Sequence, residues 1–117
     1  MKLVLACLCT CVLLAGADEV ALSFTAPSGE ITGLAWGNDY LWAVDTNNHT
    51  LYQLNPTSGD VINSFTVSVA ANHEITGLAF YNNTLYVGED WPGSTNSGYV
   101  YRYSTTGTFQ GGVDVVC

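Results

Sequence analysis

A six-residue segment that occurs twice constrains this chain more than any other feature. The letters EITGLA occupy residues 30–35 and return, identical, at residues 74–79. The similarity continues downstream, where residues 40–45 match residues 84–89 at the same 44-residue spacing. Periods of about 20–50 residues indicate architectures in which similar units stack on one another. The sequence therefore predicts two stacked units.

Each unit has the pattern of four short strands separated by turns. Residues such as Tyr52, Gln53 and Leu54 alternate between apolar and polar, as in a strand with one buried face. The two innermost runs are almost wholly apolar, which is typical of strands buried on both faces. Segments rich in Asn, Pro and Gly predict the turns between the strands. The expected strands are 31–36, 41–44, 50–54 and 61–67 in the first unit, and 75–80, 85–87, 99–103 and 108–115 in the second.

Four strands in about 44 residues match the size of one β-propeller blade. The residues also resemble blades of secreted NHL-type, YVTN-type and glutamine-cyclotransferase-like propellers. The resemblance rests on an apolar strand at 33–36, on Asp45 closing the second strand, and on the corner LNPTSG at 54–59. The chain departs from that pattern where Asn55 replaces the usual Asp and where Glu89 replaces Asp45 in the second copy. The resemblance implies an all-β fold of antiparallel blades and implies no particular activity.

The repeat also sets the expected domain boundaries. Residues 19–25 echo the fourth strand of the first unit and predict one extra strand before the first blade. A single blade cannot bury both of its apolar faces, so it needs neighbours. We therefore expect further blades, in cis or in trans, and a chain that is part of a longer protein. The expected partial propeller spans 18–117, with the extra strand and its connector at 18–29, blade 1 at 30–69 and blade 2 at 70–117.

Residues 1–17 have the pattern of a secretory signal peptide. Lys2 precedes an apolar run at 3–14, and the small residues 15–17 follow, as a signal peptidase requires. The run is shorter than the roughly 20 residues that span a bilayer, so a membrane anchor is the weaker alternative. Cleavage leaves 100 residues, which contain no membrane segment and a single cysteine, Cys117. A single thiol cannot close an internal disulfide. We therefore expect either that Cys117 pairs with another chain or that the protein continues beyond this sequence.

The net charge of the chain excludes some classes of binding partner. The chain has 10 acidic and 2 basic side chains and a formal net charge of −8, while 48% of its residues are hydrophobic. A nucleic-acid backbone must be met by Lys and Arg, so nucleic-acid binding is excluded. Anionic lipid is disfavoured for the same reason. The expected setting is extracellular or periplasmic, with a protein or carbohydrate as the ligand.

The candidate site residues follow from the resemblance to propellers. In that fold the connection between blades and the turn between the second and third strands share one face, which usually carries the binding site. Trp91 lies in the turn at 90–98, which is five residues longer in the second copy, and such insertions often map to a binding face. Its indole is expected either to stack on a sugar or to fold back over the blade edge. The candidates on this face are Glu30, Asp45, His49, His73, Glu74, Glu89, Asp90 and Trp91.

No cofactor is expected, with Ca²⁺ as an alternative. Glu30, Glu74 and Glu89 are candidates for a ring of hard oxygen ligands. No ligand run of the D-x-D-x-D-G kind occurs, however. The competing interpretation is that Asp45 and Glu89 cap their turns by accepting backbone N–H groups.

Catalytic motifs are missing from the sequence. It contains no Gly-x-Ser-x-Gly elbow, zinc-binding spacing or phosphate loop. A non-catalytic binding segment is therefore expected. Two alternatives stay open: part of a propeller enzyme (a cyclotransferase, lactonase or lyase), and a self-assembling structural or adhesion module. Asn48 and Asn82 begin N-glycosylation sequons, which matter if the host glycosylates.

Overall fold

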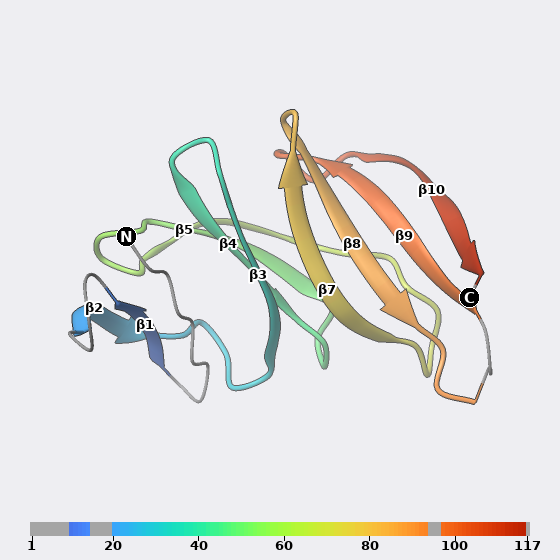
Figure 1. The fold of residues 1–117 in the computed structure, drawn as a ribbon, viewed down its shortest axis with the longest axis horizontal. Coiled ribbons are helices and arrows are strands. Elements are labelled where there is room, and N and C mark those ends of the chain that lie inside the picture. Colours follow the sequence, from blue (N-terminus) through green and yellow to red (C-terminus); the bar gives the residue numbers. More distant parts are fainter. Residues whose placement is uncertain (1–9, 15–19, 94–96, 117) are drawn as a thin grey trace.

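The computed structural model describes residues 10–14, 20–93 and 97–116. Within these residues the chain forms ten strands in three antiparallel sheets (Figure 1). Two of the sheets have four strands each, in the orders β3-β4-β5-β6 and β7-β8-β9-β10, and they are called blade 1 and blade 2 below. The all-β prediction of two four-stranded antiparallel blades is confirmed. The strand bounds are β1 Thr10–Leu14, β2 Val20–Thr25, β3 Ile31–Gly37, β4 Tyr40–Asp45, β5 Thr50–Leu54, β6 Val61–Thr66, β7 Glu74–Tyr81, β8 Thr84–Asp90, β9 Ser97–Ser104 and β10 Phe109–Val116.

Two-residue turns close the first hairpin of each blade. Asn38 and Asp39 have φ angles of 53° and 63°, and Asn82 and Asn83 have 47° and 60°. Consecutive positive φ angles are needed in the tight hairpin turns that match strand twist, and Asn and Asp tolerate them. The Nδ2 of Asn38 donates a hydrogen bond to Oδ1 of Asn83, so the two turns meet across the blades.

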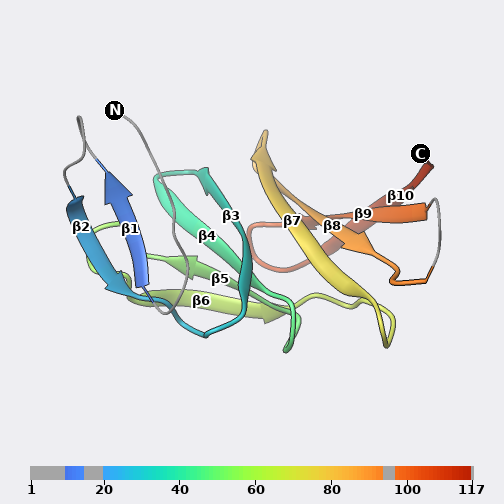
Figure 2. The ribbon, with the colours of Figure 1, turned by 60° about the horizontal axis from the view of Figure 1, so that its bottom comes forward.

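The repeated sequence produces a repeated register. In both blades the pairing of the first two strands shifts at the same place, between Ile31 and Gly33 and between Ile75 and Gly77. β3 and β7 lie side by side (Figure 2). A Cβ atom on Gly33 would lie 3.0 Å from the backbone nitrogen of Leu78, so glycine lets the two strands approach closely.

The main core fills the space between the two blades. Trp42 is fully buried there, stacks on Phe80 with 6.0 Å between ring centroids, and donates from Nε1 to the Gly37 carbonyl at 3.0 Å. Tyr103 reaches the same core, and its hydroxyl accepts a hydrogen bond from the Ser68 backbone at 3.1 Å. The buried members of this core are Trp42, Val44, Leu51, Val67, Ile75, Leu85, Val87 and Tyr103.

The innermost strands differ from the prediction. Residues 31–36 and 75–80 were expected to be buried on both faces, yet Trp36 is 52% exposed and β7 contains several exposed side chains. Each of these strands lies at an edge of its sheet, so it has a hydrogen-bonded neighbour on one side within its blade. The adjacent strand β4 is the deeply buried one, from Leu41 through Asp45.

The predicted extra strand is β2, and its packing repeats a contact found between the blades. The Phe24 side chain of β2 covers Gly59, which has φ +77°, and the Phe65 side chain of β6 covers Gly107, which has φ +90°. A Cβ atom would lie 2.3 Å from the Phe24 ring at the first glycine and 2.7 Å from the Phe65 ring at the second. β2 therefore packs against blade 1 in the same way as β6, the last strand of blade 1, packs against blade 2.

β2 is paired with β1, whose residues fall inside the predicted signal peptide. Thr10 pairs with Thr25 and Leu13 with Leu22 in an antiparallel arrangement. The rest of that predicted segment, residues 1–9 and 15–17, lies outside the described residues, as does Cys117. Among the residues that the structure describes, no helix is long and apolar enough to cross a membrane.

Candidate functional site

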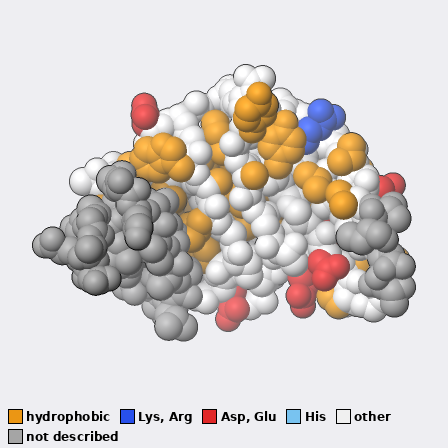
Figure 3. Space-filling model, viewed as in Figure 1, with side chains coloured by type: hydrophobic (Ala, Val, Ile, Leu, Met, Phe, Trp, Pro, Cys, Tyr) orange, Lys and Arg blue, Asp and Glu red, His pale blue; other side chains and the backbone are white. Residues whose placement is uncertain are grey.

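The turns that carry the predicted site residues gather at one edge of the molecule. The β2–β3, β6–β7 and β8–β9 connections all lie at the lower edge in Figure 1. Acidic side chains lie along the same edge in the space-filling view (Figure 3). The topology thus brings together segments that are far apart in the sequence.

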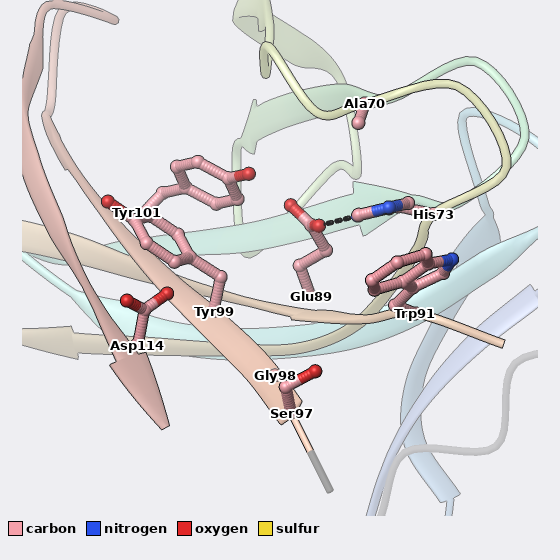
Figure 4. A pocket seen from close by; sticks show the side chains of 9 residues that line it. All are labelled: Ala70, His73, Glu89, Trp91, Ser97, Gly98, Tyr99, Tyr101 and Asp114. Carbon is pink, nitrogen blue, oxygen red and sulfur yellow. Dashed lines mark hydrogen bonds and ion pairs between the residues drawn. The ribbon is translucent and has the colours of Figure 1, made fainter. Parts of the chain in front are cut away.

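A pocket of about 310 Å³ lies at the blade 2 end of this edge (Figure 4). This volume falls at the lower end of the range for small-molecule sites, roughly 300–1,000 Å³. The β6–β7 connection, β8 and its following turn, β9 and β10 all contribute to the lining. Its polar and aromatic lining residues are His73, Glu89, Trp91, Ser97, Tyr99, Tyr101 and Asp114.

Glu89 is the buried charged group of the pocket. It is 7% exposed, and its Oε1 contacts Nδ1 of His73. The other oxygen, Oε2, is buried and has no hydrogen-bond partner among the described residues. Leaving a buried polar atom unpaired is unfavourable by about 1–3 kcal/mol, and by more for a charged group. The atom is therefore a buried hydrogen-bond acceptor that the described residues leave unsatisfied.

His73 and Trp91 form one wall. Their rings stack with centroids 5.4 Å apart and an interplanar angle of 20°. Trp91 remains 52% exposed despite this contact. The indole thus packs on the His73 ring and still offers surface to the pocket.

Two tyrosines and an aspartate form the opposite wall. Tyr99 and Tyr101 lie on the same face of β9, with ring centroids 4.6 Å apart. Asp114 on β10 is paired in register with Tyr99. Burial raises the pKa of Tyr101 above its ordinary value of 10.0, and the neighbouring Tyr99 and Tyr103 raise it further. The candidates drawn from the sequence omitted these three residues, although the alternation along 99–103 already placed the tyrosines on one face.

Asp45, at the position equivalent to Glu89, has a different role. Its Oδ1 accepts the backbone N–H groups of Asn47 at 2.7 Å and Asn48 at 2.9 Å, and its Oδ2 accepts the Ser28 hydroxyl. Both oxygens are therefore occupied, as the turn-capping interpretation expected. The same interpretation does not describe Glu89, whose longer side chain reaches His73 instead.

The other sequence candidates lie outside the pocket. Glu30, Glu74 and Asp90 are exposed and do not line it, and Glu74 is paired in register with Asp90. His49 sits half-buried in the β4–β5 turn with φ 51°. In the part of the chain that the structure describes, no three His, Cys, Asp or Glu side chains are placed to hold a metal ion. Glu30, Glu74 and Glu89 are thus not gathered into a calcium site.

The two sequon asparagines are both exposed. Asn48 lies in the β4–β5 turn, where its Oδ1 accepts the Thr50 backbone N–H at 3.0 Å. Asn82 lies in the hairpin turn between β7 and β8. Glycosylation of either residue remains a prediction.

Comparison with known proteins identifies the fold. No family model and no curated protein matches the sequence. Among solved structures, a europium-containing methanol dehydrogenase is similar, with a TM-score of 0.61 and 14% sequence identity. The match covers 82% of this chain and 19% of that chain, so this chain spans about a fifth of the matched protein. At this identity the likeness shows the fold alone: the chain has the architecture of two β-propeller blades.

Proposed function

We propose that this chain is a segment of a secreted, non-catalytic β-propeller, of the NHL or YVTN kind, that binds a carbohydrate in the blade 2 pocket. One observation carries the proposal: a buried carboxylate oxygen, Oε2 of Glu89, lies unpaired in a pocket walled by aromatic rings. Ligand sites typically combine apolar walls with a few polar groups that fix orientation.

The chemistry of the walls suits a sugar ring. The faces of Trp91 and Tyr99 offer apolar surface for the C–H face of a pyranose. Glu89 and Asp114 offer carboxylate oxygens, which accept hydrogen bonds and cannot donate them when ionised. Sugar hydroxyl groups supply the matching donors. His73 is held by Glu89 on one side and by Trp91 on its ring face, which supports a role as a wall of the pocket.

The test is calorimetric titration of the full chain with monosaccharides. Trp91→Ala is expected to weaken binding at least about tenfold, because its indole forms one wall. Trp36→Ala is the matched control, since Trp36 is equally exposed at 52% but does not line the pocket. Loss of binding in both variants, or no binding by the unmodified chain, would contradict the proposal.

A second candidate, self-assembly, is favoured by the outer face of blade 2. Leu51 of blade 1 is fully buried against blade 2, whereas Val100, its counterpart in the repeat, is only half-buried. Val113 and Val115 on the adjacent strand are 57% and 41% exposed. We propose that a blade of another copy of this chain covers this face. Light scattering of the full chain should show assemblies that Val113→Asp dissociates; a monodisperse monomer would refute the assembly.

A further inference from the structure

We propose that the blade 2 pocket selects sugars that carry a positively charged amino group. This inference rests on the carbohydrate-binding function proposed above and names the ligand class of the same site. It starts from the charges that face the pocket, then considers the buried acceptor and the aromatic walls.

Among the described residues, the pocket is lined by carboxylates and by no Lys or Arg side chain. Glu89 and Asp114 both line it. The whole chain has two basic residues, Lys2 and Arg102. Lys2 lies outside the described residues, and Arg102 alternates on β9 to the face opposite Tyr101, where its Nη2 donates to the Gln110 carbonyl at 3.1 Å. Neither carboxylate in the pocket is therefore neutralised by Lys or Arg among the residues that the structure describes.

The unpaired oxygen of Glu89 determines which donor fits best. The carboxylate is more than nine-tenths buried, and only its Oε1 is engaged, by His73. Figure 4 shows Glu89 between the two tyrosines on one side and His73 and Trp91 on the other, so a ligand between these walls meets its free oxygen. A hydroxyl group and an ammonium group both donate charge-assisted hydrogen bonds to a carboxylate, but only the ammonium group adds the attraction between two opposite charges. An ammonium group thus satisfies Oε2 better than a hydroxyl group does.

The aromatic walls favour the same charge. Ring faces carry negative potential, and cations are attracted to Trp and Tyr within about 6 Å of the ring centre. Trp91, Tyr99 and Tyr101 all line the pocket, and Tyr99 and Tyr101 are close neighbours. A uronic acid or a sulfated sugar would instead place a negative group near Glu89 and Asp114, which is repulsive.

The experiment compares four ligands built on one ring: glucosamine, glucose, N-acetylglucosamine and glucuronate, each titrated into the full chain by calorimetry. Glucosamine should bind about tenfold more tightly than glucose, because its ammonium group adds an attraction to the carboxylate charge that a hydroxyl group lacks. N-acetylglucosamine lacks the charge and should resemble glucose, and glucuronate should bind most weakly. Equal affinity for glucosamine and glucose overturns the charge selection while leaving carbohydrate binding standing. If none of the four binds, both proposals fail.

Variants separate a direct role of the carboxylates from bulk charge. Glu89→Gln should abolish the preference for glucosamine, and Asp114→Asn, an exposed change on the opposite wall, should reduce it about threefold. Glu30→Gln is the control, because it removes one negative charge from an exposed position outside the pocket. Since Glu89→Gln also alters the His73 contact, circular dichroism should show that the variant is folded, and Asp114→Asn tests the idea independently. A loss of preference in Glu30→Gln equal to that in Asp114→Asn would overturn the proposal.

Discussion

Replacing Trp42 tests how the two blades are held together. Trp42 is fully buried between them, stacks on Phe80 and donates to the Gly37 carbonyl. Truncating a buried Trp to Ala costs about 3–5 kcal/mol in lost transfer energy and cavity formation. The unpaired carbonyl adds about 1 kcal/mol, so Trp42→Ala should approach the upper end of that range. A domain of this size has a total stability of about 5–15 kcal/mol, so this single change removes a large part of it.

The equivalent residue in the second copy provides the control. Tyr86 lies 44 residues after Trp42 in the repeat, and it is only half-buried. Tyr86→Ala should cost about 1–2 kcal/mol, because less apolar surface is lost. Trp42→Phe retains a ring beside Phe80 and loses the indole N–H, so it should cost about 1–2 kcal/mol and remain folded if Trp42→Ala does not.

Urea unfolding followed by far-UV circular dichroism measures these differences. With a slope of about 2 kcal/mol per molar urea, a loss of 4 kcal/mol lowers the midpoint by about 2 M. Trp42→Ala should therefore shift the midpoint at least twice as far as Tyr86→Ala. Equal shifts at Trp42 and Tyr86 would refute the conclusion that this face of blade 1 packs against blade 2.

Three further predictions concern a turn, a tyrosine and the N-terminus. Gly59→Ala should lower the free energy of unfolding by about 1–2 kcal/mol, because alanine is strained at φ +77° and its Cβ would meet the Phe24 ring. Gly29→Ala is the control: Gly29 has open space around it, so this change should leave the free energy of unfolding nearly unchanged in the same urea assay. The raised pKa of Tyr101 means that the folded state favours the neutral phenol, so this contribution to stability is complete below pH 10 and is lost as the pH rises through the folded pKa. Tyr101→Phe should therefore flatten the fall in melting temperature above pH 10, and an unchanged slope would contradict the assignment. N-terminal sequencing of the exported protein should begin at Asp18, and a retained Lys2 would show that residues 1–17 are not removed.

The sequence predicted the strands and hairpin turns well because both depend on local chemistry. The Asn-rich pairs fall at the turns where positive φ angles are required, and the alternation along β5 and β9 indicated which side chains share a face. The burial of β3 and β7 was predicted less well. An apolar run shows that a strand can be buried, but the elements that pack against the strand determine how much of its surface is covered. Trp36 is exposed for this reason.

The pocket was only partly predictable because β10, one of the three strands that line it, has a register shift in its pairing with β9. The pairing of β10 with β9 is interrupted between Phe109 and Gly112, where Gly111 has φ +102°. A strict two-residue period does not reveal such a bulge, and a shift of one residue moves every later side chain to the other face. Asp114 faces the pocket beside Tyr99 through that shift, so its position was evident only from the structure.

Asp45 and Glu89 show how equivalent positions of the two copies differ in their hydrogen bonds. At the first position a short carboxylate accepts three hydrogen bonds from its own turn and a nearby serine, so it has no oxygen left for a ligand. At the second position the side chain is one methylene longer and the following turn is five residues longer. The carboxylate then turns to His73 and leaves Oε2 unpaired in a pocket. Two copies of one unit fold alike because their apolar residues and turns agree, and at this polar position they differ: every carboxylate oxygen of Asp45 has a partner, whereas one carboxylate oxygen of Glu89 has none among the described residues.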